Sequence, residues 1–191
     1  MAAGKDRRIT HKKNRTLIDV ASRAPHGRKH GATFAETWST RDGATFVAVG
    51  SVVAGADPVV VSDLLRVASK TVINSPLRLE AGLASLARLI AAHARDHQDA
   101  VLAADVVLAA VEPDGKTLHV AGAERLTTLL VDGAGVQQPF TPRLTLRRGD
   151  RLIVATVPLP GIWWSHGART ADSLVRLGSG TELSAAVVSN G

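Results

Sequence analysis

Two helical patterns lie next to each other in this sequence, and segments with a strand pattern precede and follow them. In residues 77–97, apolar side chains recur every three or four residues, as they do on the buried face of a helix. This stripe consists of Leu79, Leu83, Leu86, Ile90 and Ala94. Residues 59–75 carry a similar stripe, formed by Val60, Leu64, Val67 and Val72. Two neighbouring helices argue against a fold that alternates single strands with single helices.

The segments on either side of the helices have the properties of antiparallel strands. Residues 32–40 and 44–50 are rich in apolar and β-branched side chains, and the Arg-Asp-Gly turn at 41–43 between them is typical of a hairpin. A further strand is predicted over 15–22 and a short helix over 170–177. After the helices, the strand pattern recurs in residues 103–112, 117–123, 125–135, 151–157 and 181–189. Helices grouped between runs of strands indicate an α+β layered domain.

The composition limits the kinds of site that such a domain can carry. The chain has no cysteine, which excludes disulfides, thiolate zinc sites and cysteine nucleophiles. It has no tyrosine, three Phe and three Trp, too few rings for a surface that stacks nucleic-acid bases. The sequence shows no signal-peptide pattern and no apolar run of about 20 residues. We therefore expect a cytoplasmic protein that makes no membrane contact.

Positive charge is concentrated near the N-terminus. Residues 1–30 hold nine Lys or Arg and two Asp, whereas residues 31–191 hold fourteen Lys or Arg and fifteen acidic residues. We predict that residues 1–8 form a basic flexible arm and that residues 9–191 form a single domain. Such an arm is either a solvated leader or a segment that binds nucleic acid or another acidic surface.

Four phrases of the sequence occur in the order known from one enzyme family. Residues 144–161, LTLRRGDRLIVATVPLPG, contain a Gly-Asp pair followed by an apolar strand and a turn. The other phrases are residues 9–19, 42–56 and 106–136. Together they resemble the PPM-type metal-dependent Ser/Thr protein phosphatases, including the sporulation and stress-response enzymes. The resemblance implies a four-layer α-β-β-α sandwich of two antiparallel sheets, in which aspartates hold two Mn²⁺ or Mg²⁺ ions and a bridging water attacks phosphate.

Most acidic residues of that metal centre are replaced in this chain. By the resemblance, the ligand positions fall on Thr16, Ser51, Val157 and Glu182. Only Glu182 carries a carboxylate, and Arg15 stands where the family has a glutamate. The phosphate-binding arginine of the family falls near His11. Because hard divalent cations require several oxygen ligands, the resemblance implies a vestigial site that holds no metal.

These replacements lead to one expected function and two alternatives. We expect a pseudophosphatase that needs no cofactor and acts as a regulatory, protein-binding module; its partner would be a phosphoprotein, a kinase or a phosphatase. The first alternative is an atypical Mn²⁺- or Mg²⁺-dependent Ser/Thr phosphatase that uses displaced acids, for which Asp19, Asp42 and Asp57 are the candidates. The second alternative is binding of nucleic acid or acidic surfaces through the basic arm.

Two further pairs of residues have chemistry of interest. Trp163 and Trp164 follow the strand predicted over 151–157; they either close over the end of the sandwich or anchor a protein partner. His93 and His97 lie one helical turn apart, a spacing that zinc sites use. Imidazoles at this place also interact well with the C-terminal end of a helix, and we predict that role for them.

Overall fold

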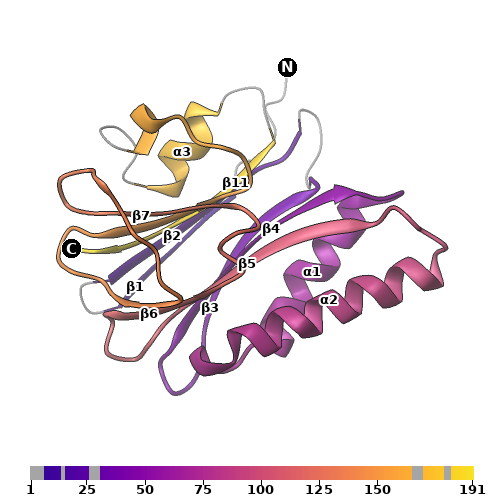
Figure 1. Ribbon diagram of the computed structural model, residues 1–191, viewed down its shortest axis with the longest axis horizontal. Coiled ribbons are helices and arrows are strands. Elements are labelled where there is room, and N and C mark those ends of the chain that lie inside the picture. The colour runs from indigo at the N-terminus through magenta and orange to yellow at the C-terminus, as the bar shows by residue number, and fades with distance from the viewer. Residues whose placement is uncertain (1–6, 14–15, 26–30, 165–169, 179–181) are drawn as a thin grey trace.

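The computed structural model describes residues 7–13, 16–25, 31–164, 170–178 and 182–191. Two antiparallel sheets pack face to face, and helices lie on both outer faces (Figure 1). The chain therefore forms an α-β-β-α sandwich, and the predicted α+β fold class is confirmed.

Each sheet draws its strands from distant parts of the chain. Sheet A has the strand order β1-β2-β11-β10-β7-β8, and sheet B has the order β3-β4-β5-β6-β9. The strands of sheet A are β1 (Arg7–Lys13), β2 (Thr16–Arg23), β7 (Thr127–Val131), β8 (Gln137–Gln138), β10 (Arg151–Ala155) and β11 (Leu183–Asn190). The strands of sheet B are β3 (Thr33–Ser39), β4 (Thr45–Ala54), β5 (Ala103–Val111), β6 (Thr117–Ala121) and β9 (Arg143–Thr145).

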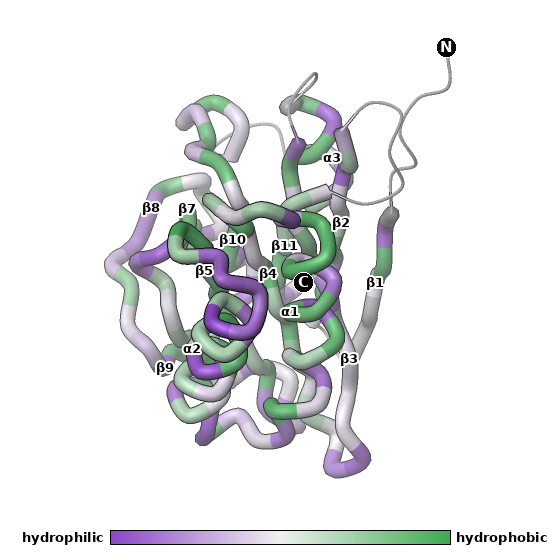
Figure 2. Tube along the Cα trace, turned by 90° about the vertical axis from the view of Figure 1, so that its right-hand side faces the viewer, coloured by the Kyte–Doolittle hydropathy of each residue, from purple (hydrophilic) through white to green (hydrophobic). Residues whose placement is uncertain are grey.

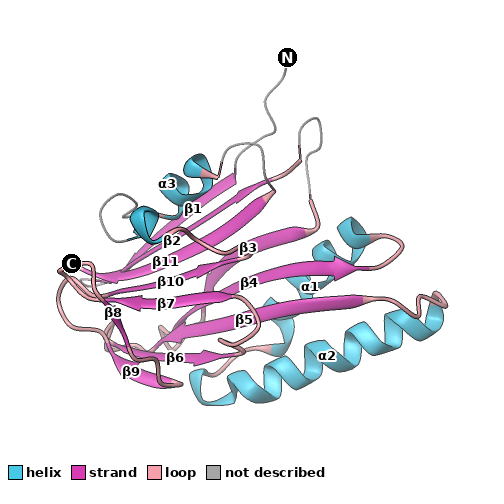
Figure 3. Ribbon diagram, turned by 45° about the horizontal axis from the view of Figure 1, so that its top comes forward, coloured by secondary structure: helices cyan, strands magenta, loops and turns pink. Residues whose placement is uncertain are grey.

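Helices cover the outer face of each sheet (Figure 3). The long helices α1 (Pro58–Val72) and α2 (Leu79–Asp96), with a 3₁₀ turn at Pro76–Arg78 between them, lie on sheet B. The short helix α3 (Ala171–Leu177) packs on β2 and β11 of sheet A. The three predicted helices are thus confirmed within a few residues at each end. In the described part of the chain, no helix is long and apolar enough to cross a membrane.

Apolar side chains form three buried layers. The layer between the sheets includes Ile18, Val20, Val49, Val107, Leu118, Leu152 and Val188. The layer beneath α1 and α2 includes Phe46, Val61, Leu65, Leu86 and Leu108. The layer beneath α3 includes Ile153, Leu174, Val175, Leu183 and Val187. Figure 2 shows the same division along the chain, with apolar segments in the central strands and polar segments at peripheral turns.

The buried face of α1 differs from the one that apolar spacing predicts. The structure buries a face made of Val61, Ser62, Leu65 and Ser69. By contrast Val60, Val67 and Val72 are 52%, 58% and 39% exposed, so the predicted stripe was wrong. Serine can face the sheet because the Ser69 hydroxyl donates to the carbonyl oxygen of Leu65 at 2.8 Å.

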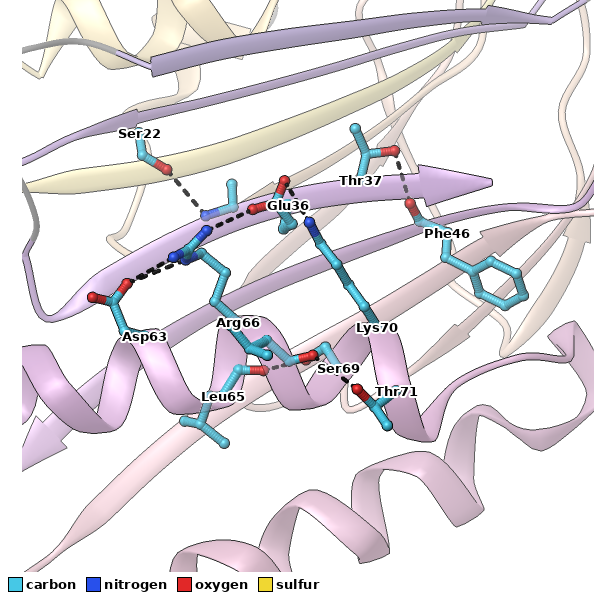
Figure 4. Close-up of polar contacts among 12 residues, drawn as sticks. Ser22, Glu36, Thr37, Phe46, Asp63, Leu65, Arg66, Ser69, Lys70 and Thr71 are labelled. Carbon is cyan, nitrogen blue, oxygen red and sulfur yellow. Dashed lines mark hydrogen bonds and ion pairs between the residues drawn. The ribbon is translucent and has the colours of Figure 1, made fainter. Parts of the chain in front are cut away.

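A buried carboxylate on β3 helps to attach α1 to sheet B. Glu36 is 1% exposed, and Nη1 of Arg66 and Nζ of Lys70 each lie 3.3 Å from one of its oxygens. Figure 4 shows both cations reaching Glu36 from α1. The contact between helix and sheet is therefore partly ionic, which apolar periodicity does not reveal.

The strand at the edge of sheet A was not predicted. β1 has the sequence RRITHKK, which lacks the alternation of apolar and polar residues that marks a half-buried strand. It pairs with β2 from Arg7 opposite Ser22 to Lys13 opposite Thr16. The sheet therefore begins inside the predicted arm of residues 1–8, and residues 1–6 lie outside the described part of the chain.

Candidate functional site

Strand ends from both sheets meet at one end of the sandwich. Sheet A contributes the end of β2 and the start of β11, since Arg23 pairs with Leu183. Sheet B contributes the start of β3, the end of β4 and the start of β5, since Ser51 lies opposite both Thr33 and Asp105. We call this region the intersheet end. Three of the predicted site positions lie here: Ser51, Val157 and Glu182.

A chain of hydroxyl groups joins the two sheets at the intersheet end. Oγ1 of Thr33 on β3 lies 2.9 Å from Oγ of Ser184 on β11, and Ser184 donates to Oγ of Ser22 on β2 at 2.9 Å. Ser22 in turn accepts the N–H of Ala35 at 3.0 Å, a bond drawn in Figure 4. Each of these hydroxyls is thus engaged with another protein group. We call the three side chains of Ser22, Thr33 and Ser184 the hydroxyl network.

Glu182 is the predicted ligand position that carries a carboxylate, and it binds the backbone. Its Oε1 accepts the N–H of Thr33 at 2.6 Å, which ties the start of β11 to the start of β3. The connection to β3 passes so close that a Cβ on Gly31 would collide with this carboxylate and with Pro25. A side chain at position 31 would therefore displace the Glu182 carboxylate from its place beside the Thr33 N–H.

Ser51 and Val157 lie at the intersheet end but belong to different layers. Ser51 is half-buried on β4 opposite Asp105, whose carboxylate lies 3.7 Å from Nη1 of Arg125. Val157 packs against the outer layer beneath α3. Its neighbour Thr156 binds β11 instead, because its hydroxyl oxygen accepts the N–H of Ser184 at 3.1 Å. The corner that ends β10 therefore contributes packing and a backbone contact.

Thr16 lies at the opposite end of the sandwich from the other predicted positions. It begins β2, pairs with Asn190 at the end of β11, and its buried hydroxyl donates to the carbonyl oxygen of Gly115. A strand advances about 3.3 Å per residue, so Thr16 and Ser22 are about 20 Å apart. The structure does not bring Thr16 to the intersheet end; the residue of β2 found there is Ser22.

The alternation of side chains between the two faces of β2 indicates that Ser22 belongs to the site. Ile18 and Val20 face the layer between the sheets, and the next residue on that face is Ser22. His11 lies on β1 opposite Ile18. The side chain of His11 and all of Arg15 lie outside what the structure describes.

The displaced acid Asp19 has a structural role on the other face of β2. It is 1% exposed, and its carboxylate accepts hydrogen bonds from Nε of Arg8 at 2.9 Å, the Thr10 hydroxyl at 2.8 Å and the Ala171 N–H at 3.0 Å. The hydrogen bond to Asp19, followed by its negative charge, raises the pKa of the Arg8 guanidinium. One carboxylate thus holds β1, β2 and the start of α3 together.

The other two displaced acids stabilise local structure. Asp57 caps α1, where its Oδ1 accepts the N–H of Val60 at 3.3 Å. Asp42 lies in the turn between β3 and β4, at the far end of sheet B, where it accepts hydrogen bonds from the Thr40 hydroxyl and the Ala44 N–H. Neither carboxylate forms part of the hydroxyl network.

The side chains at the intersheet end do not offer the oxygen ligands that a centre with two divalent cations needs. Mn²⁺ and Mg²⁺ need several oxygen ligands, most of them from carboxylates or water. Across the described ranges, no three side chains of His, Cys, Asp or Glu come together in a way that could hold a metal ion. The hydroxyls present bind one another, and Glu182 binds a backbone N–H. No reaction step through a metal follows from this arrangement.

The paired tryptophans lie against the outer layer of sheet A. Trp163 and Trp164 are both half-buried and pack against the apolar cluster beneath α3. The carbonyl oxygen of Trp164 also accepts a hydrogen bond from Nη2 of Arg151 at 3.2 Å. The pair thus packs on the outer face of sheet A, and binding of a partner through its partly exposed rings stays a prediction.

The rings of the two histidines of α2 lie close together, tilted against each other, at the end of that helix. The ring centroids of His93 and His97 are 4.2 Å apart, and the His97 N–H donates to the carbonyl oxygen of His93 at 3.0 Å. Both lie in the last turn or at the cap of α2, where imidazole interacts favourably with the helix dipole.

Solved structures share this fold. No protein-family model matches the chain, and no curated protein matches its sequence. RsbX, solved in complex with magnesium, has a TM-score of 0.69 and 8% identity over 95% of this chain and 98% of that chain. The serine/threonine phosphatase of S. agalactiae has a TM-score of 0.67 and 11% identity over 92% of this chain and 100% of that chain.

A third structure combines the PP2C phosphatase domain of SpoIIE from Bacillus subtilis with a fragment of its regulatory domain. Its TM-score is 0.63 at 14% identity, and the match covers 96% of this chain but 64% of that chain. The chain therefore has a PPM phosphatase-like fold, and the resemblance predicted from its motifs is confirmed for the fold.

Removing the central hydroxyl of the network should weaken the link between the sheets. We expect Ser184→Ala to lower the free energy of unfolding by about 1–3 kcal/mol, because the partly buried hydroxyls of Ser22 and Thr33 each lose a hydrogen-bond partner. Ser189→Ala on the same strand is the control, since its hydroxyl makes only a long bond of 3.5 Å to Leu17. Urea denaturation of both variants measures the difference; equal losses would contradict a special role for Ser184.

Proposed function

We propose that this chain is a pseudophosphatase: a PPM phosphatase-like domain without catalytic activity that binds and regulates a protein partner in the cytoplasm. The observation that supports this most strongly is the hydroxyl network. At the end of the sandwich where the resemblance places metal ligands, neutral side chains of Ser22, Thr33 and Ser184 bind one another. The remaining carboxylate, Glu182, is bound to the Thr33 N–H.

The chemistry of phosphate-ester hydrolysis explains why this arrangement favours binding over catalysis. A metal centre of the PPM type lowers the pKa of a bound water and neutralises the charge that develops on phosphate. Hydroxyl groups that are already hydrogen-bonded supply neither effect. The positions Ser51, Val157 and Thr16 likewise offer no anionic oxygen. A scaffold that keeps its packing without these ligands is suited to recognising another protein.

The proposed partner is a phosphoprotein, a kinase or a phosphatase, and Trp163 and Trp164 are candidates for contacts with it. Two of the matched structures support a regulatory setting. SpoIIE is described as a cell fate determinant, and another match belongs to work on the bacterial stressosome as a system adapted to control secondary messenger signalling. For this chain, regulation through protein binding remains the proposal that these relatives support.

The test is hydrolysis of para-nitrophenyl phosphate with Mn²⁺, with Mg²⁺ and with a chelator. We expect no metal-dependent turnover, together with an unchanged melting temperature on adding either metal, because a bound ion would stabilise the fold. Circular dichroism before and after the assay checks that the protein is folded. Metal-dependent turnover, or a melting temperature that rises with Mn²⁺, would contradict the proposal.

A positive assay would have to be assigned to specific acids. If the chain is an atypical Mn²⁺- or Mg²⁺-dependent phosphatase, Asp57→Ala should abolish its turnover, whereas loss of the helix cap alone costs about 1 kcal/mol and leaves the fold intact. Binding through the basic arm predicts instead an affinity for DNA or RNA that falls steeply with salt and is lost when the predicted arm, residues 1–8, is removed.

A further inference from the structure

Sheet A has an open edge along β1. This strand lies at the end of the strand order of its sheet, and in the described ranges only β2 pairs with it. Figure 2 shows β1 at the outer margin of the molecule. Arg8 and Thr10 are exposed and Ile9 is half-buried, whereas Ile18 and Val20 of β2 are fully buried. In the part of the chain that the structure describes, the free side of β1 is therefore open to solvent.

The free side of β1 offers backbone hydrogen-bonding groups along the whole strand. In an antiparallel pair, alternate residues direct their N–H and C=O groups to the partner strand, and the residues between them direct these groups away. β1 pairs with β2 over 7 residues, which span about 23 Å at the spacing of a strand. Unpaired strand edges of this kind bind extended peptides by adding them to the sheet as a further strand.

The charges of β1 decide which strand can be added to it. Its sequence has two cations at each end, Arg7 with Arg8 and Lys12 with Lys13, and it contains no acidic residue. The residues of β2 directly opposite these four are Ser22, Ala21, Leu17 and Thr16, none of which is acidic. Asp19 compensates one of the four charges by binding Arg8. The edge as a whole thus favours an added strand that carries carboxylates.

The same charges disfavour a second copy of this chain as the added strand. Two β1 strands paired antiparallel about Thr10 would place Arg7 opposite Lys13 and Arg8 opposite Lys12. Like charges directly opposite each other destabilise strand pairing. Lysine on an edge strand is a common protection against such self-association, but it leaves the backbone groups available to a strand of opposite charge. The charge pattern therefore selects an acidic segment of another protein.

We infer that β1 binds an extended, acidic segment of a protein partner by strand addition, with carboxylates of the segment beside Arg7, Lys12 and Lys13. This goes beyond the proposed function, because pairing with the edge of sheet A requires neither the hydroxyl network nor the loss of a metal site. The phosphatase assay and the binding experiment below can therefore fail independently of each other.

Fluorescence anisotropy with a labelled peptide of about eight alternating Glu and Val residues tests the inference. We expect saturable binding to the full chain and no binding of the matched Lys and Val peptide. Two further peptides keep the charges but carry N-methyl groups, one on every Val and the other on every Glu. Because only one of these sets directs its N–H groups to β1, one methylated peptide should bind about tenfold more weakly than the other. Equal affinities of the methylated and unmethylated peptides would overturn the inference.

Variants of the chain test the place of binding. Lys12→Gln/Lys13→Gln removes two of the cations of β1 and should weaken binding about tenfold. Arg147→Gln/Arg148→Gln, which removes two adjacent exposed cations between β9 and β10, is the matched control and should bind as the unmodified chain does. Circular dichroism checks that both variants are folded. Equal affinities of the two double variants would contradict binding at β1.

Two further measurements separate strand addition from attraction between opposite charges. Removal of residues 1–6 leaves all of β1 in place and should not change the affinity for the peptide. Bound peptide should slow amide hydrogen exchange in residues 7–13, because it shields the free edge of the strand. If a DNA duplex binds more tightly than the acidic peptide and the peptide leaves amide exchange unchanged, the edge attracts polyanions without pairing. That result would overturn the choice of a protein segment.

Discussion

Replacing Gly122 by valine is expected to lower the free energy of unfolding by about 3–5 kcal/mol. Gly122 directly follows β6 and has a φ of +73°, in the left-handed region that β-branched residues rarely adopt. A Cβ at this position would lie 2.6 Å from the carbonyl oxygen of Val106, a backbone atom that cannot turn aside. Thermal and urea denaturation measure the loss.

The control for this prediction is the same substitution at Gly135. Its φ is +84°, but no atom lies near the place that a Cβ would take. Gly135→Val should therefore show the cost of backbone strain alone, about 1–3 kcal/mol. If both variants lose the same stability, the close approach of Gly122 to β5 does not contribute as argued.

Truncation of Leu65 on α1 should also have a large effect. Leu65 is fully buried beneath the helix pair, so Leu65→Ala removes apolar contacts and leaves a cavity, at a cost of about 2–5 kcal/mol. Val67→Ala, two residues further along, should change stability by less than about 0.5 kcal/mol because Val67 is 58% exposed. Urea denaturation compares them. A larger loss of stability in Val67→Ala than in Leu65→Ala would contradict this and would support the buried face predicted from apolar spacing.

The two helices show why apolar spacing was enough in one case and misleading in the other. α2 buries Leu79 and Leu86 as predicted, because its contact with the sheet is made by large apolar side chains. α1 buries two serines beside Val61 and Leu65 and binds β3 through the ion pairs of Glu36, whereas Val60 and Val67 are exposed. A pattern based on hydrophobicity alone assigns such a helix to the wrong face.

The candidate site could be predicted from the sequence only in part, because it depends on how distant strands pair. Ser51 and Glu182 lie together at the intersheet end, and each adjoins a strand that the sequence marks clearly. Thr16 does not lie there, because β2 pairs with β11 in a register that places Thr16 opposite Asn190, at the far end of that strand. A sequence resemblance also cannot show that hydroxyls from three strands bind one another, since Ser22, Thr33 and Ser184 are far apart in the chain.

Asp19 links segments that are separated by most of the length of the chain. Its buried carboxylate binds Arg8 and Thr10 on β1 and the first N–H of α3, so opening of either segment leaves this carboxylate with fewer hydrogen-bond partners. Local opening of the N-terminal edge and local opening of α3 are therefore coupled through one buried side chain of β2.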